Sequence, residues 1–230
     1  MTAREILFGL ALLSVALNTT AANPSLMTDT NSGSEIVSHD GSPKTNLPLV
    51  LEDKVFSSAY YDVLNILSAR NHCSEFFGGA ATIDIFNLMV AKMRKSYFSA
   101  NIGIRMSGKT ENLIDRQTNR VYRLFEKVSI NANGPFYRAK SFIFDQALPG
   151  VGTYKPATRE VRVLMLLHEL GHAVATDDGK WLLPNDGNDE VLSRSNSMKI
   201  ETMCGKEIAD LGRVEGKTEV AANTADEKHH

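Results

Sequence analysis

One segment constrains the fold of this chain more than any other. Residues 158–174 read TREVRVLMLLHELGHAV, and their apolar side chains recur at the three- and four-residue steps of a helix. Apolar residues occur on nearly every side of this helix, so we expect the rest of the domain to bury it. The segment is too short, and too often interrupted by Arg, His and Glu, to cross a membrane.

The end of this helix carries side chains that can bind a metal ion or transfer a proton. His168 and His172 are four residues apart, and Glu169 directly follows the first histidine. Residues four apart share one face of a helix, so both imidazoles can bind one metal ion while Glu169 reaches toward a water molecule on it. Burying two histidines and a glutamate is costly without partners, and a metal ion would serve all three. The alternative is that the histidines bond to backbone and the spacing is accidental.

Gly171 lies between these residues, inside the expected helix. A glycine there costs about 1 kcal/mol relative to alanine. Two explanations are open: the glycine lets another backbone pass close to the site, or a packed helix simply tolerates it.

Residues 158–178, with their H-E-x-x-H pattern, resemble the active-site segment of the zincin class of zinc metallopeptidases. The longer stretch 54–208 looks like a group of uncharacterised exported bacterial proteins. The resemblance implies Zn²⁺ as cofactor and peptides or proteins as substrates. It also implies that Glu169 is the general base, which takes a proton from a zinc-activated water as that water attacks a peptide bond. In zincins, a strand beside the active-site helix holds an extended substrate by main-chain hydrogen bonds.

A catalytic zinc site needs a third protein ligand besides His168 and His172. No histidine follows the motif until the C-terminal tail, so we expect a carboxylate. Asp178 lies six residues after His172, the spacing of the third ligand in zincins that read H-E-x-x-H-x-x-G-x-x-H or -D, and it is our first candidate. Ala175 stands where that pattern has its glycine, so other acids remain open as the third ligand: Asp186, Asp189 and Glu190.

The N-terminus has the order of a secretory signal peptide. Arg4 precedes an apolar run over residues 6–17, and small and polar residues follow. We predict a signal peptide at 1–22, cleaved after Ala22, and a secreted or periplasmic protein with no membrane attachment after cleavage. An uncleaved anchor is the alternative. Residues 23–52 are rich in Ser, Thr, Asn, Asp, Gly and Pro, which predicts a flexible leader that could also be a pro-segment.

The expected export bears on the oxidation state of the chain's two cysteines, Cys73 and Cys204. In an oxidising compartment a lone pair of cysteines favours a disulfide, which here would join an early helix to the last one. Two free buried thiols are the alternative if the protein is not exported.

Residues 53–211 predict one α+β domain, zincin-like by resemblance, and residues 212–230 predict a disordered tail. The expected architecture is a small, mostly antiparallel sheet packed on the H-E-x-x-H helix, with additional helices around it. Besides 158–174, helical spacing occurs at 57–70, 82–97 and 195–211, and short β-favouring runs occur at 102–106, 121–130 and 141–144.

Composition narrows the possible partners. The 230 residues are 43% hydrophobic, with 25 basic and 27 acidic side chains and a formal net charge of −2. This is ordinary globular composition, and it argues against a nucleic-acid partner. We therefore predict an exported zinc metallopeptidase. The alternative is a non-catalytic exported domain, zinc-binding or structural, with a degenerate zincin site. The sequence does not indicate the oligomeric state.

Overall fold

The computed structural model describes residues 49–99, 102–115 and 119–226. The predicted signal peptide (1–22) and nearly all of the predicted leader (23–52) lie outside the described residues. Every described residue belongs to one compact unit, Thr45–His230. Within the described ranges, no helix has both the length and the apolar composition that a membrane span requires.

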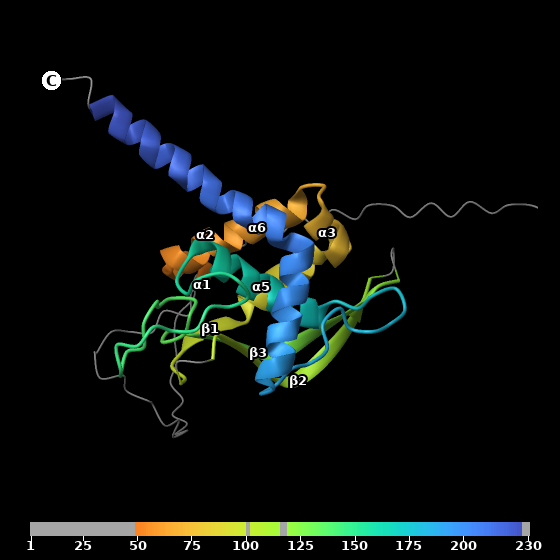
Figure 1. Cartoon of the computed structure of the whole chain (residues 1–230). Helices are drawn as coiled ribbons and strands as arrows, with labels where there is room; N and C mark the ends of the chain where they lie inside the picture. The colour runs from red at the N-terminus through yellow and green to blue at the C-terminus, as the bar shows by residue number, and fades with distance from the viewer. Residues whose placement is uncertain (1–48, 100–101, 116–118, 227–230) are drawn as a thin grey trace, which may run out of the picture. The chain divides into compact units, whose positions relative to one another are not determined.

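The described part of the chain has six helices and three strands, which confirms the α+β class (Figure 1). In chain order they are α1 (Leu49–Glu52), α2 (Lys54–Ser68), α3 (His72–Phe77), α4 (Ala81–Ala91), β1 (Met93–Ser96), β2 (Ile104–Ile114), β3 (Val121–Asn131), α5 (Arg159–Ala173) and α6 (Glu190–Asp226).

The three strands form one sheet in the order β1-β3-β2. The long pair is antiparallel: Ile104 of β2 lies opposite Ile130 of β3 and Ile114 lies opposite Val121, with a shift in register between Ser107 and Thr110. The short strand β1 runs parallel to β3, so the sheet is mixed and not wholly antiparallel. No strand pairs with the other side of β2 among the described residues, so β2 is an edge strand.

Two local predictions were wrong. The helix expected over 82–97 ends at Ala91, because the backbone of Met93–Ser96 pairs with β3 instead. The run 141–144, expected as a strand, forms an exposed turn closed by a hydrogen bond from the amide of Ser141 to the carbonyl of Gln146. The three large apolar side chains of this run are 70–76% exposed. β-branched and aromatic residues favour a strand only where neighbours cover them, and these side chains remain largely exposed.

The predicted central helix is α5. Thr158 caps its first turn by accepting a hydrogen bond from the amide of Val161. Residues on all sides of α5 are buried, as predicted, because it packs against α2, α4, α6 and the sheet (Figure 1). At its end, Val174 turns to extended backbone and bridges Tyr122 of β3. The sheet therefore fixes the position of the last turn of α5, which carries the H-E-x-x-H motif.

The predicted disulfide is present: Cys73 of α3 is bonded to Cys204 of α6, and both residues are completely buried. The last helix is longer than expected. It begins at Glu190, where the Asp189 side chain accepts hydrogen bonds from the amides of Val191 and Leu192, and it runs to Asp226 rather than to residue 211. Helical backbone thus extends over residues that the sequence suggested were tail.

Candidate metal centre

The two histidines of the motif lie side by side on α5. The Nε2 atoms of His168 and His172 are 3.1 Å apart, and both side chains are buried. The helical spacing alone predicted this arrangement, because positions i and i+4 share one face. Two imidazole nitrogens at this separation are suited to binding one ion between them.

The acid that joins them is Asp186, one of the alternatives, and not Asp178. Its Oδ2 is 3.0 Å from Nε2 of His168, and its Oδ1 is 3.4 Å from Nε2 of His172. The three residues offer ligand atoms that all lie within 4.8 Å of one another. His168, His172 and Asp186 therefore form a group that could hold a metal ion.

Asp178, the first candidate from spacing, lies in an exposed turn away from the imidazoles. Its carboxylate accepts a hydrogen bond from the Thr176 hydroxyl and pairs with Lys180 at 2.9 Å. The chain after α5 reverses in a hairpin, in which Ala175 bridges Trp181 and residue 178 lies at the tip. The sequence signal was Ala175, which stands where the zincin pattern has a glycine and indicated that this turn differs from the turn in that pattern.

The other two acids have different positions. Asp189 caps the first turn of α6, and Glu190 is exposed in that turn. Both line the same pocket as the histidines, but neither belongs to the converging group.

Gly171 explains how Asp186 reaches the histidines. The amide of Leu183 donates to the carbonyl of Gly171 at 3.0 Å, and the amide of Leu182 donates to that of Val174 at 2.8 Å. The Leu183 side chain fills the space over the glycine: a Cβ at position 171 would lie 2.6 Å from Leu183 Cδ1. The glycine therefore makes room for a side chain of the segment that leads to Asp186, rather than for a close backbone as the first explanation had it.

Helix α6 supplies two further contacts that sequence reasoning missed. The hydroxyl of Ser197 lies 3.0 Å from Nδ1 of His168, which leaves Nε2 of that ring to face the site. The amide nitrogen of Asn196 donates to Asp186 Oδ2 at 3.3 Å and to the carbonyl of Pro184 at 3.0 Å. Such contacts orient metal ligands and raise affinity. Sequence spacing could not find them, because they come from a separate helix.

The charges of the group are coupled. For His172, burial disfavours the charged ring, but the Asp186 hydrogen bond and the nearby Glu169 carboxylate outweigh this and raise its pKa. For Asp186, burial favours the neutral acid, yet hydrogen bonds to both histidines hold its pKa far below the usual range. Burial raises the pKa of Glu169, although the neighbouring histidines oppose the shift. The site therefore keeps Asp186 ionised and makes Glu169 a better proton acceptor than an exposed glutamate.

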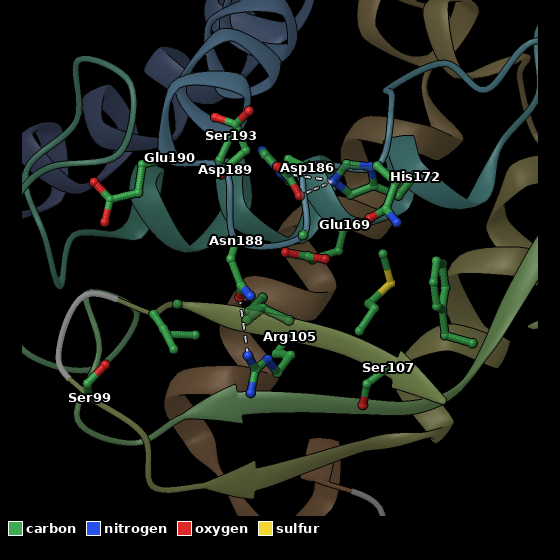
Figure 2. Close-up of a pocket in the computed structure, with 18 residues that line it drawn as sticks. Ser99, Arg105, Ser107, Glu169, His172, Asp186, Asn188, Asp189, Glu190 and Ser193 are labelled. Carbon is green, nitrogen blue, oxygen red and sulfur yellow. Dashed lines mark hydrogen bonds and ion pairs between the residues drawn. The ribbon is translucent and has the colours of Figure 1, made fainter. Parts of the chain in front are cut away.

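The group faces a pocket with a volume of about 620 Å³. One wall is the edge strand β2, and the other is formed by α5 and the segment that leads into α6 (Figure 2). Figure 2 shows Glu169 on the pocket side of α5, facing β2. Across the opening, Nη2 of Arg105 donates to Oδ1 of Asn188 at 3.3 Å. The pocket therefore exposes both the metal-binding group and Glu169 to a ligand.

The geometry of the donor atoms is compatible with one bound metal ion. Two ligand atoms at about 2.0–2.1 Å from a tetrahedral zinc ion are about 3.3 Å apart. Nε2 of His168 lies 3.1 Å from Nε2 of His172 and 3.0 Å from Oδ2 of Asp186, whereas the 3.4 Å contact of His172 is to the other carboxylate oxygen, Oδ1. The two imidazole nitrogens and the carboxylate face one another, and a cation or a shared proton between them can satisfy this arrangement. Two nitrogens and one oxygen are donor atoms that several divalent metal ions accept.

Comparison with protein-family models, with curated proteins and with solved structures finds no match to this chain. What the fold and site themselves define is an α+β domain with a largely buried His-His-Asp group that could hold a metal ion.

Proposed function

We propose that this protein is a zinc-dependent metallopeptidase. The observation that carries the proposal is the convergence of His168, His172 and Asp186, with Glu169 beside them on the wall of an open pocket. Three protein ligands facing a pocket are typical of a catalytic zinc site, whereas structural zinc sites have four protein ligands.

Different residues of the site would bind the metal ion, transfer the proton and hold the ligands in position. The two histidines and Asp186 would hold the ion, which when bound supplies a Lewis acid for polarising a carbonyl and activating water. Glu169 is not needed as a ligand, and its raised pKa suits proton exchange nearer neutral pH. Its carboxylate accepts a proton from the attacking water and returns it to the leaving amine nitrogen. Ser197 and Asn196 hold His168 and Asp186 in place.

The edge strand supports a peptide as the substrate class. Residues 102–107, which include the start of β2, line the pocket opposite the metal-binding group. Since β2 has no second partner strand among the described residues, an extended peptide can add to its free edge through main-chain hydrogen bonds. A pocket of about 620 Å³ is large enough to take substrate side chains beside the ligands.

One observation favours a non-catalytic zinc-binding domain as the second candidate. His168 and His172 belong to α5, while Asp186 belongs to the segment between α5 and α6. An ion held by all three would tie these parts together and stabilise the fold without any turnover.

Four single variants separate these candidates. Metal content by mass spectrometry and cleavage of a denatured protein and a peptide library are measured for each. Glu169→Gln should keep one zinc per chain and lose hydrolysis, while His168→Ala and Asp186→Ala should lose both. Asp178→Asn is the matched control, because it removes an exposed carboxylate that lies outside the metal-binding group and should change neither. Wild-type protein without zinc would overturn the proposal, and zinc without cleavage of any substrate would favour the non-catalytic domain.

We also propose that the protein is exported. The buried disulfide between Cys73 and Cys204 supports an oxidising compartment. Mass spectrometry of the protein from the periplasm or culture medium should find a mature N-terminus at residue 23. An intact N-terminus and reduced cysteines would contradict export.

A further inference from the structure

Arg123 of β3 binds the end of the helix that carries the histidines. Its guanidinium donates two hydrogen bonds to the backbone carbonyl of His172, from Nε at 3.1 Å and from Nη2 at 2.7 Å. This carbonyl lies in the last turn of α5, where helix carbonyls have no partner in the helix itself. A cation is also favourable there, because the helix dipole places partial negative charge at the C-terminus.

The same guanidinium contacts the segment that leads to the third ligand. It stacks on the ring of Trp181, 4.2 Å from the ring centroid, and lies 4.9 Å from the centroid of Phe125 on its own strand. Trp181 is fixed to Ala175 by a β-bridge and begins the run that passes over Gly171 and ends at Asp186. One side chain of the sheet thus contacts both segments that supply the metal-binding group.

We propose that Arg123 is a positioning residue for the metal centre. It fixes the position of His172, and through Trp181 that of the segment carrying Asp186, relative to the sheet. This inference rests on the proposed zinc-binding function. Two donors of a rigid planar group that converge on one oxygen limit both the translation and the rotation of the helix end. Lysine keeps the charge but offers neither the paired donors nor the flat face that stacks on Trp181.

Arg162, which belongs to α5 itself, provides a matched control for Arg123. Its guanidinium also donates to two backbone carbonyls, from Nε to Phe136 at 2.9 Å and from Nη2 to Ala157 at 2.7 Å. These bonds anchor the first half of α5 and not the turn that holds His172. Arg162→Lys therefore removes comparable interactions and lowers stability, but leaves the metal-binding group in place.

The test measures zinc affinity by competition with a chelator, at a temperature where circular dichroism shows each variant to be folded. Arg123→Lys should raise the Kd for Zn²⁺ by about 10- to 100-fold, as loss of an outer contact to a ligand typically does. Arg162→Lys should leave this Kd near the wild-type value. A second readout is the visible absorption of the Co²⁺-loaded protein, which reports ligand geometry and should change in Arg123→Lys alone.

Each outcome supports or overturns the inference. If Arg123→Lys binds Zn²⁺ as tightly as wild type, or if both lysine variants weaken binding equally, the positioning role is wrong while the zinc site stands. If the wild-type chain binds no Zn²⁺, the metal site and this inference fail together. Should Arg123→Lys not fold, Trp181→Leu removes the stacking partner alone, and an unchanged Kd in that variant would overturn the link to Asp186.

Discussion

Replacing Gly171 with alanine should destabilise this protein, although helix propensity predicts the reverse. Alanine is favoured over glycine inside a helix by about 1 kcal/mol. The new Cβ, however, would lie 2.6 Å from Cδ1 and 2.7 Å from Cγ of Leu183, well inside the contact distance of about 3.5–4.0 Å for two carbon atoms. Leu183 is completely buried and cannot move into solvent. Overpacking of this kind costs about 1–3 kcal/mol, so the net effect ranges from no gain to a loss of about 2 kcal/mol.

Gly205 in α6 is the matched control for this substitution. A Cβ there would meet its nearest atoms at 3.7 and 3.9 Å, which are ordinary contacts. Gly205→Ala should therefore raise the free energy of unfolding by about 1 kcal/mol. Urea unfolding of the two variants, followed by circular dichroism, should give shifts that differ by about 1–3 kcal/mol, with Gly171→Ala the less stable.

Zinc affinity and a double variant extend the test. Since Leu183 bonds to Gly171 and precedes Asp186 by three residues, Gly171→Ala should also weaken zinc binding, whereas Gly205→Ala should not. In a Leu183→Ala background the obstruction is gone, and Gly171→Ala should then stabilise the protein. The reasoning is refuted if Gly171→Ala stabilises wild type as much as Gly205→Ala does.

Three other perturbations have predictable results. Ser197→Ala should raise the zinc Kd by about 10- to 100-fold with little change in urea midpoint, and equal affinity would show that its bond to His168 is dispensable. Replacing Cys73 and Cys204 together by alanine should lower the free energy of unfolding by about 2–5 kcal/mol under non-reducing conditions, where a loss below about 1 kcal/mol would contradict a structural role. Burial alone would raise the pKa of Asp53, but hydrogen bonds from Lys95 and from a backbone amide lower this pKa overall. The ionised Asp53 carboxylate therefore stabilises the fold above about pH 4, and this stabilisation is lost as pH falls through the folded-state pKa. The difference in unfolding free energy between wild type and Asp53→Asn should therefore shrink in a pH series below about 4, and a constant difference would exclude this origin.

Local patterns in the sequence predicted the centre of the fold. The apolar periodicity of 158–174 identified α5 and its burial, because a helix that is apolar on every side has no stable exposed position. The four-residue spacing placed His168 and His172 together, since that distance is fixed by helix geometry alone. The disulfide was predicted from the chemistry of cysteine and from the expected export, and neither requires knowledge of the path between the cysteines.

The third member of the metal group could not be read from spacing. A six-residue offset from His172 selects Asp178 only if the chain turns tightly after the helix, and here it forms a hairpin instead. Asp186 arrives by a longer path that depends on how Leu183 packs over Gly171. That packing is a contact between segments separated in sequence. The one sign of it in the sequence was Gly171, a glycine inside a helix.

The errors in secondary structure have a related cause. The run 141–144 has strand-favouring residues, but strand formation needs a partner with free hydrogen-bonding groups, and this segment closes on itself. Residues 93–96 continued a helical pattern, yet β3 offered them a partner and took them into the sheet. In both places, neighbours distant in sequence decided the outcome.

The bond between Cys73 and Cys204 turns 132 residues of the chain, counted inclusively from a separation of 131, into a covalent ring. His168, Glu169 and Asp186 all lie inside this ring, and so does the exposed turn at 141–146. A single cut in that turn would therefore leave a two-chain molecule whose halves stay attached and keep the metal-binding group on one piece. After such a cut the protein would therefore remain one covalently linked particle.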